Sequence, residues 1–426
     1  MRLLLLTNYF PPEIGTGPHL IHELGESLAK SGHNITVVTG FPRYNVPEMP
    51  EKYRGRLHYR EKMDGMEVLR INALNFYGRS VLSRGLVQLL APPMLGLQAM
   101  LASKPDLVYA VSPPLLMGVI ARLTAARFRV PCVVNVQDMF PQTMIDLGVL
   151  KNRALIKIFE MLERFVYRSA TALTVMSDGN REFVVNRGAA PQNVHTVFNW
   201  TDTEAIQPVE RMNDFRREHG LDDQFVVLFA GTMGISQGLE VAVHAARQLA
   251  DEPNLMFLLI GDGIARAGLE REAAGLKNVR FLPMQPKEKY PQVLAAADAC
   301  LVTLKPEVLT HSVPSKISTI MAAGRPILAS LPLHSDAPQI IAMAQAGIVT
   351  PAADYMQLAE AVRELKRNSA LAAQLGANGR RFAEKYLARQ SIVEQYIGIF
   401  QELIDRHKRG RGSKNSFSDK GKGMHP

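Results

Sequence analysis

The stretch FVVLFAGTMGISQGLE (225–240) decides the fold, because an apolar run passes directly into a glycine-rich loop and then into a helical pattern. An apolar run of this length, rich in branched and aromatic residues, is typical of a buried parallel strand. The chain then repeats the order, with LMFLLIG (255–261) followed by DGIARAGLE (262–270). Strands that alternate with helices in this way predict an α/β fold with a parallel sheet covered by helices on both faces.

The same alternation extends outward over most of the chain and is interrupted once, by the polar stretch TDTEAIQPVERMND (201–214). The sequence therefore predicts two tandem Rossmann-like, doubly wound domains facing a cleft, over residues 1–203 and 204–385. A helix over 386–406 is long enough to cross back to the first domain, and the Gly/Ser/Lys-rich segment 407–426 predicts a disordered basic tail. The predicted strands are 2–7, 35–39, 67–72, 106–111, 130–136, 171–176 and 194–198 in the first domain, and 225–230, 255–261, 279–283, 299–304, 326–330 and 347–350 in the second.

The bulk composition restricts the class of protein. A chain of 426 residues with 47% hydrophobic and 21% charged residues is long enough for two buried cores. Its two cysteines, Cys132 and Cys300, lie in apolar runs without C-x-x-C spacing, which predicts a reducing compartment and no structural zinc. No run reaches the roughly 18 apolar residues of a membrane span, so we expect a cytoplasmic protein.

The net charge of +9 is concentrated toward the C-terminal tail. A basic tail suits anionic lipid or nucleic acid, and it equally suits a solubilising end. No nucleic-acid-binding motif accompanies it, and we expect no nucleic-acid partner.

Two glycines follow the first predicted strand, in NYFPPEIGTGPHLIHEL (8–24). Gly15 and Gly17 allow close approach of a ligand to the start of the next helix, or they serve only a tight turn. The spacing is not G-x-G-x-x-G, because position 20 is leucine, and this counts against a dehydrogenase.

Three loops of the second domain should converge at the carboxyl ends of its strands, where doubly wound sheets bind ligands. The first loop carries Gly231 and Gly234, and the second carries Gly261 and Gly263. The third loop places Lys316 after Ser315 at a helix start, a combination that suits a pyrophosphate. The alternative is that Ser315 is only a helix cap and Lys316 a solvated charge.

Asp138 follows another predicted strand, in QDMFPQT (137–143). A carboxylate at a strand end can orient an acceptor hydroxyl, take its proton or stabilise a developing cationic sugar. The alternative is a structural cap for the helix that begins near residue 142.

Several of these motifs, in this order, resemble the family 4 glycosyltransferases of the GT-B fold, above all the members for colanic acid, capsule and O-antigen biosynthesis. The resemblance covers about residues 1–400. The motifs that carry it include NYFPPEIGTG (8–17), QDMFP (137–141), AGTMGISQGLE (230–240), IGDGIARAGLE (260–270) and PSKISTIMAAGRPI (314–327).

The resemblance implies a role for each candidate position. Residues 15–17 would face the donor phosphates or the acceptor, and Asp138 would stand near the reacting sugar, where relatives often have a histidine. Residues 231–234, including Thr232, and 261–263 would lie along the nucleotide. The backbone around Met284 would read the edge of the base, and Ser315 and Lys316 would meet the diphosphate. The family retains anomeric configuration and needs no tightly held metal, so no cofactor is expected besides the nucleotide-sugar donor.

The chain departs from the family pattern at four positions. Many relatives carry two glutamates where this chain has His311 and Thr319. Relatives also often have cations at the positions of Thr232 and Gln237. Lys316, helped by Arg266 and Lys305, would then have to replace these cations at the diphosphate.

The resemblance therefore implies a retaining transfer from a UDP- or GDP-linked sugar to a lipid-linked or saccharide acceptor in bacterial surface polysaccharide synthesis. The stretch 84–104 and the basic tail would supply peripheral attachment to the cytoplasmic membrane face, unless 84–104 is a buried helix pair. Two alternatives remain open. One is a nucleotide-sugar epimerase of the same architecture, and the other is a non-catalytic nucleotide-binding homologue.

Overall fold

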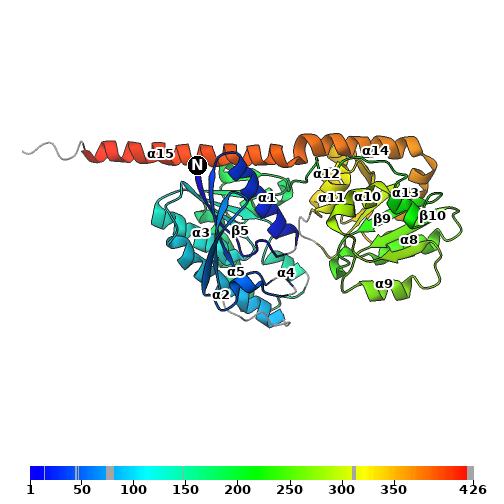
Figure 1. The fold of residues 1–426 in the computed structure, drawn as a ribbon, viewed down its shortest axis with the longest axis horizontal. Helices are drawn as coiled ribbons and strands as arrows, with labels where there is room; N and C mark the ends of the chain where they lie inside the picture. The colour runs from blue at the N-terminus through cyan, green and yellow to red at the C-terminus, as the bar shows by residue number, and fades with distance from the viewer. Residues whose placement is uncertain are drawn as a thin grey trace, which may run out of the picture. The chain divides into compact units, whose positions relative to one another are not determined.

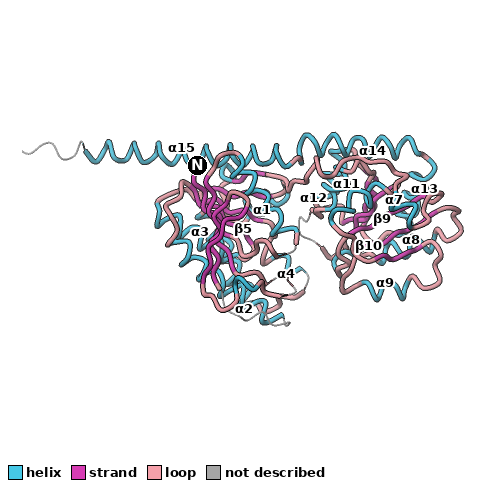
Figure 2. Tube along the Cα trace, viewed as in Figure 1, coloured by secondary structure: helices cyan, strands magenta, loops and turns pink. Residues whose placement is uncertain are grey.

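The computed structural model describes residues 1–13, 15–43, 46, 48–72, 81–146, 148–308 and 313–419, with the side chains of 16, 81–89, 287 and 411–419 excepted. The chain forms two compact units (Figure 1). The first unit comprises residues 1–141, 150–197 and 392–426, and the second comprises 142–149 and 198–391. Each unit is built around one sheet, with helices on both of its faces (Figure 2).

The sheet of the first unit has eight strands in the order β3-β4-β2-β1-β5-β6-β7-β8. Every neighbouring pair is parallel except β3 and β4. The direction of winding reverses between β1 and β5, which makes this the switch point of the sheet. The strands are β1 (Arg2–Leu6), β2 (Asn34–Gly40), β3 (His58–Met63), β4 (Met66–Ile71), β5 (Leu107–Ser112), β6 (Cys132–Val136), β7 (Ala172–Val175) and β8 (Val194–Thr196).

Strand β3 is the one strand that the sequence prediction missed. Its sequence HYREKM is polar, because it lies at the edge of the sheet with alternate residues exposed. It forms a hairpin with β4 through Asp64 and Gly65, both in the left-handed region with φ of 48° and 81°. An Asp-Gly pair between two short runs is a hairpin signal that would have found it.

The second unit has six parallel strands in the order β11-β10-β9-β12-β13-β14. This is the strand order of a dinucleotide-binding sheet, and its switch point lies between β9 and β12. The strands are β9 (Phe225–Ala230), β10 (Leu255–Ile260), β11 (Val279–Leu282), β12 (Ala299–Thr303), β13 (Ile327–Leu331) and β14 (Gly347–Pro351).

The buried runs of the second unit serve both faces of its sheet. Leu228 belongs to one core cluster and its neighbour Phe229 to another, because successive side chains of a strand point to opposite faces. A strand buried on both faces needs a continuous apolar run, as in FVVLFA. The predicted fold of two doubly wound parallel α/β domains is confirmed.

The helices cover the faces of the two sheets. Among the residues described, none of them combines the length and apolar content that crossing a bilayer requires. In the first unit they are α1 (Thr16–Lys30), α2 (Val81–Met100), α3 (Leu115–Phe128), α5 (Arg153–Ser169) and α6 (Asp178–Asn186). The second unit has α4 (Gln142–Asp146), α7 (Asp214–Glu218), α8 (Glu240–Gln248), α9 (Arg266–Glu272), α10 (Tyr290–Ala295), α11 (Lys316–Ala322), α12 (Asp336–Ala344), α13 (Tyr355–Arg367) and α14 (Ser369–Phe382).

The last helix, α15 (Arg389–Asp419), differs from the prediction in its extent. Its residues from Ile392 onward belong to the first unit, where Tyr396 and Phe400 are buried against Tyr109. The helix continues to Asp419, so the predicted disorder of the tail is wrong over 407–419, and 420–426 lie outside the described residues. Extending a helix that is already anchored adds one hydrogen bond per residue without a new nucleation cost, which favours helix over composition here.

Candidate functional site

Three loops of the second unit meet at the switch point of its sheet, at the carboxyl ends of β9, β10 and β12. The loop after β9 is joined to the loop after β10 by a hydrogen bond from the amide of Met233 to the carbonyl of Asp262, 2.8 Å long. It is joined to the loop after β12 by a bond from the amide of Lys305 to the carbonyl of Ser236, 3.0 Å long. Backbone hydrogen bonds therefore join the three loops, as the sequence predicted.

Two of the candidate glycines are required by this close approach. A Cβ atom on Gly261 would lie 1.8 Å from the carbonyl oxygen of Gly231, and one on Gly263 would lie 2.4 Å from that of Met233. Both glycines also have positive φ, 148° and 151°. Any side chain at either position would push the two loops apart. A Cβ on Gly234 would meet nothing within 4 Å, so its surroundings are open.

Lys316 packs against β9 and the loop that follows it. It is the first residue of α11, and its Nζ donates to Oε1 of Gln237 at 2.9 Å and lies 3.7 Å from the centroid of the Phe229 ring. A Cβ on Gly231 would come within 3.7 Å of the same ammonium. Lys316 is thus a partly buried cation held over an aromatic face, not a solvated surface charge.

Burial lowers the pKa of Lys316 from 10.5 to about 7. The cause is desolvation, which disfavours the charged ammonium. Gln237 supplies a neutral oxygen, so the charge has a hydrogen-bond partner without being neutralised. An anionic group placed beside Nζ would restore its full charge, a property that suits the position to a phosphate ligand.

The other candidates of the second unit differ in exposure and in hydrogen bonding. Ser315 is exposed, and its side chain makes no capping bond within the described residues. The Thr319 hydroxyl donates to the carbonyl of Ser315 at 3.4 Å. Thr232 is exposed beside Gly231, and Met284 is 52% exposed after β11. His311 lies outside the described residues.

Arg266 and Lys305, unlike Lys316, each lie beside a carboxylate of the protein. The Arg266 guanidinium donates to the carbonyl oxygen of Gly261 at 2.7 Å and pairs with Glu270 at 2.8 Å, so it braces the second loop. Lys305 lies 3.8 Å from Glu240 and keeps a loose partner. The interpretation that both replace missing diphosphate cations stays a prediction, and Arg266 is the more firmly held of the two. The pattern that would have revealed its role is the helical i, i+4 pair with Glu270.

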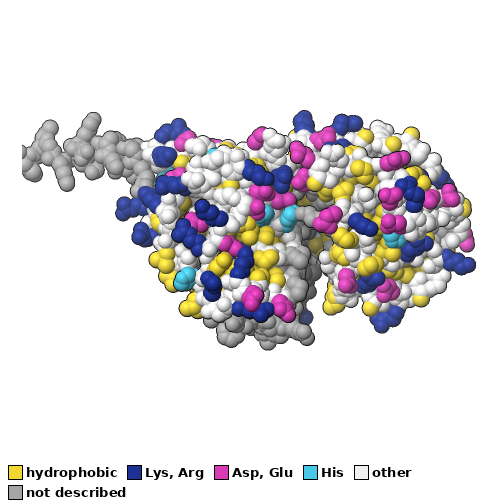
Figure 3. All heavy atoms as spheres, viewed as in Figure 1, with side chains coloured by type: hydrophobic (Ala, Val, Ile, Leu, Met, Phe, Trp, Pro, Cys, Tyr) yellow, Lys and Arg dark blue, Asp and Glu magenta, His cyan; other side chains and the backbone are white. Residues whose placement is uncertain are grey.

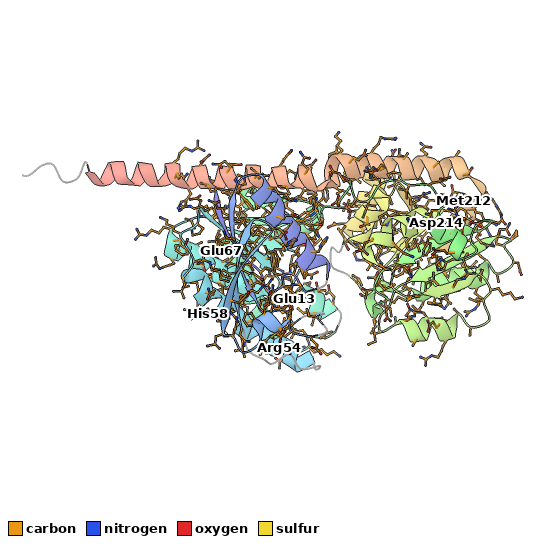
Figure 4. The ribbon with its side chains drawn as sticks, in the orientation of Figure 1. Glu13, Arg54, His58, Glu67, Met212 and Asp214 are labelled. Atoms are coloured by element: carbon orange, nitrogen blue, oxygen red, sulfur yellow. The ribbon has the colours of Figure 1, made fainter. Side chains whose placement is uncertain are left out.

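The switch point of the first unit carries the loop with Gly15 and Gly17. Gly15 directly precedes α1, and a Cβ on Gly17 would meet nothing within 4 Å. Glu13, which comes from the same loop after β1 (Figure 4), is buried. Its two carboxylate oxygens accept hydrogen bonds from the backbone amides of Phe10 and Arg43, each 2.9 Å long. Sequence reasoning missed this residue, because nothing in the pattern around Glu13 shows that its partners are the backbone amides of Phe10 and Arg43.

Arg70 fixes this loop from below. Its side chain is fully buried in β4, where its Nε donates to Glu61 at 2.6 Å and a terminal nitrogen donates to the carbonyl oxygen of Pro11. A buried charge is tolerated only when it is paired and hydrogen-bonded. The first unit thus ties residues 10–13, at the start of the glycine-bearing loop, to β4 and to the amide of Arg43.

Asp138 lies in the loop after β6, next to the same switch point. The amide of Gln137 donates to the carbonyl of Ser112 at 2.9 Å, which ties the loops after β6 and β5 together. The Asp138 side chain is exposed, although the protein around its carboxyl still desolvates it enough to raise its pKa. A water-accessible carboxyl with a raised pKa is suited to proton transfer.

Comparison with known proteins agrees with this architecture. Residues 15–200 match the glycosyl transferase 4-like domain, and residues 224–368 match the glycosyl transferases group 1 domain. The chain is a family 4 glycosyltransferase. The resemblance read from the sequence motifs is confirmed.

Two curated relatives of this glycosyltransferase span most of its length. The putative colanic acid biosynthesis glycosyl transferase WcaI of Escherichia coli (strain K12) is 27% identical over 412 residues, 93% of this chain and 99% of the relative. The probable glycosyltransferase WbjE of Pseudomonas aeruginosa is 27% identical over 77% of this chain and 82% of its own length.

Solved structures share the fold of the glycosyltransferase. Sucrose-phosphate synthase of Thermosynechococcus elongatus has a TM-score of 0.76 at 18% identity, covering 95% of this chain and 99% of its own. Anabaena HepE in complex with UDP has a TM-score of 0.71 at 16% identity, covering 94% and 100%. At these identities the likeness shows the GT-B fold alone.

A buried chain of hydrogen bonds runs behind Asp138 in the glycosyltransferase. The Tyr396 hydroxyl of α15 accepts from Nδ2 of Asn135 at 3.2 Å, and Oδ1 of Asn135 accepts from Nε2 of Gln137 at 2.6 Å. Nδ2 of Asn135 also donates to Thr174 at 2.9 Å. The last helix therefore orients the residue that directly precedes Asp138. Sequence reasoning missed these hydrogen bonds because Thr174 and Tyr396 are far from Asn135 in the sequence.

We expect Tyr396→Phe to lower the turnover of the glycosyltransferase by about 3- to 10-fold while leaving donor binding unchanged, the loss of about 1 kcal/mol of orienting hydrogen bond. Tyr109 also donates to the Tyr396 hydroxyl, at 3.5 Å, so the melting temperature should fall as well. Steady-state kinetics and titration with a UDP-sugar separate the two effects. The control is Tyr386→Phe, which removes the hydroxyl of a tyrosine that is 41% exposed; equal kinetics for both variants would exclude an orienting role.

Metal ligation has no candidate in the part of the chain that the structure describes, where no three His, Cys, Asp or Glu side chains group together to hold an ion.

Proposed function

We propose that this glycosyltransferase transfers a sugar from a UDP- or GDP-linked donor with retention of anomeric configuration. The observation that carries the proposal is the Lys316 ammonium beside the Gly231 backbone, at the switch point of a dinucleotide-type sheet. The hydrogen-bond partner of Lys316, Gln237, is neutral. The pKa of Lys316 is about 7, so Lys316 can take up a proton when a diphosphate binds. The UDP complexes of structural neighbours support a nucleotide ligand for this fold.

The donor assignment gives each candidate of the second unit a task. Gly231 lets the nucleotide approach the backbone, Gly261 and Gly263 hold the second loop against the first, and Lys316 stabilises the charge that develops on the leaving diphosphate. Many relatives have a glutamate at the position of Thr319, whose carboxylate would accept hydrogen bonds from both ribose hydroxyls. The Thr319 hydroxyl can offer only one weaker, neutral hydrogen bond. With Lys316 providing the positive charge, transfer requires no resident metal.

We propose that Asp138 of the first unit acts on the acceptor side. A raised pKa and access to water fit a group that orients an acceptor hydroxyl or takes its proton. The names of the relatives, which include a colanic acid glycosyl transferase and an O-antigen chain mannosyltransferase, support a lipid-linked or saccharide acceptor in bacterial surface polysaccharide synthesis. Such an acceptor would place the enzyme in the cytoplasm, in peripheral contact with the inner membrane.

A thermal-shift screen tests the donor assignment. Any ligand that binds only the folded state raises the melting temperature by mass action. We expect UDP or GDP, and the matching nucleotide sugar, to raise it, and nucleoside monophosphates to act much more weakly because they lack the second phosphate. No shift with any nucleoside diphosphate or nucleotide sugar would contradict the proposal.

The same donor, incubated without acceptor, separates transfer from epimerisation. Recovery of the unchanged nucleotide sugar, with slow release of nucleoside diphosphate at most, is expected of a transferase. Formation of the epimeric nucleotide sugar would instead establish the epimerase alternative.

A further inference from the structure

Helix α5 presents an apolar strip to solvent. Ile158, Met161 and Phe165 are three and four residues apart, so they share one face of the helix. All three are exposed, Met161 to 66%. The opposite face packs into the unit through Val166 and Tyr167, which are buried. A soluble helix normally turns its apolar strip inward, and α5 has a second strip that faces outward.

A row of cations runs beside this strip. Arg153, Lys157, Arg164 and Arg168 are spaced by four, seven and four residues, so they also share one face. All four are exposed and line a hollow of about 880 Å³ along the helix. Within the described residues none of the four forms an ion pair. The strip and the row together are called the α5 surface.

The helices that neighbour α5 also have exposed apolar residues. A Cβ on Gly118 of α3 would lie 2.5 Å from Val166 of α5, and a Cβ on Gly96 of α2 would lie 2.8 Å from Ile120 of α3. Helix α3 therefore lies between α2 and α5, and the inner faces of all three helices enter one core cluster. Further exposed leucines are Leu97 of α2, Leu123 of α3 and Leu101, which directly follows α2. On the visible face of the first unit, hydrophobic side chains lie among lysines and arginines (Figure 3).

We infer that the α5 surface docks the enzyme on an anionic phospholipid bilayer. An apolar strip flanked by unpaired lysine and arginine side chains is the combination that lies in a membrane interface, where the strip enters the acyl boundary and the cations meet lipid phosphates. A protein partner would have to be strongly acidic and apolar at once. The inference deepens the proposed membrane contact and moves it from 84–104 and the tail to α5.

Vesicle co-sedimentation of the full chain tests the α5 surface. We expect binding to phosphatidylcholine vesicles that contain phosphatidylglycerol, little binding to phosphatidylcholine alone, and release at high salt because the charges are screened. Arg164→Glu should weaken binding by about fivefold or more, the effect of losing one surface cation. Met161→Glu should weaken it further, because it places a charge in the apolar strip.

Each variant has a matched control in the second unit. Met343→Glu and Arg367→Glu change exposed residues of the same types, and Met343 is 60% exposed. Equal loss of binding in variant and control, or equal binding to both kinds of vesicle, would overturn the inference. Full binding by Met161→Glu would assign attachment to the tail instead. A wild-type dimer that Met161→Glu converts to a monomer would assign the surface to a second copy.

The proposed chemistry is tested separately, so the two can fail independently. The nucleotide-induced thermal shift of Met161→Glu should equal that of the wild type, because the α5 surface lies in the other unit from Lys316. Vesicle binding without a nucleotide shift would sink the donor assignment and leave the docking surface standing.

Discussion

Lys316→Met should weaken nucleotide-sugar binding by about 100-fold or more, and it should raise the melting temperature of the free enzyme. Binding weakens because the variant lacks a charge-assisted hydrogen bond to the diphosphate, worth about 1.5–3 kcal/mol. It also lacks the electrostatic attraction between a partly buried cation and the diphosphate. The melting temperature rises because methionine keeps the packing against Phe229 and replaces a desolvated amine with an apolar group. An increase of about 2–4 °C corresponds to 1 kcal/mol in a unit of this size.

The sign of the stability effect depends on pH. The pKa of Lys316 is about 7 in the folded protein and 10.5 in its ordinary state. Between these values the unfolded chain binds more protons, so this group makes the wild type more stable as pH rises from 7 to 10.5. The stabilisation of Lys316→Met should therefore be largest at pH 7 and below, and it should vanish toward pH 10.5. Thermal melts across this range measure it.

Donor affinity should carry the complementary pH dependence. A bound diphosphate raises the pKa of Lys316, so binding takes up a proton whenever the free enzyme is above pH 7. Wild-type affinity for a UDP-sugar should be flat below pH 7 and should fall above it, by up to about tenfold per pH unit. Lys316→Met should show no such slope. A UDP-sugar is the right ligand because its esterified diphosphate does not titrate in this range.

The control is Lys289→Met, which removes an exposed lysine of the same unit with a partner 3.9 Å away. It should leave both affinity and its pH profile unchanged. If Lys316→Met binds the donor as tightly as the wild type does, the ammonium has no part in donor binding. The site would then have to rely on Lys305 and backbone amides.

The sequence predicted the fold because the buried strands of both sheets are continuous apolar runs, and a run such as FVVLFA has few other ways to be buried. It missed β3, whose residues are polar because the strand lies at a sheet edge. It also misjudged the extent of the last helix, since the composition of 407–419 contains no sign that the helix is anchored at Tyr396.

The site was predictable where it depends on backbone geometry. Gly261 and Gly263 stood out as positions where the backbone could approach a ligand, and the structure places a carbonyl oxygen of the neighbouring loop against each. The partners of Lys316 were not predictable. Gln237 is 79 residues away in the sequence, and Phe229 is a strand residue whose face depends on the register of the sheet. The hydrogen bonds that connect Tyr396 to Gln137 through Asn135 could not be predicted for the same reason, because only tertiary packing brings Tyr396 to Asn135.

Asp138→Asn should lower turnover by about 10²-fold or more while changing donor affinity little. A positioned general base contributes about 10²–10⁴ to the rate, and asparagine keeps the shape of the side chain but cannot take a proton. The raised pKa of Asp138 predicts that wild-type turnover falls on the acid side as its carboxylate is protonated. That limb of the pH profile should be absent in Asp138→Asn.

Two measurements distinguish this role from that of a helix cap. A cap would show itself as a loss of melting temperature with kinetics nearly intact, because its free energy of about 1 kcal/mol acts on folding. A base acts on the transition state, so turnover falls while the nucleotide-induced thermal shift stays as in the wild type. Asp251→Asn, at an exposed turn of the second unit, supplies the matched control. Full activity of Asp138→Asn would assign Asp138 to the cap, and the acceptor side of the mechanism would then have to be sought on the loop that Glu13 and Arg70 hold in place.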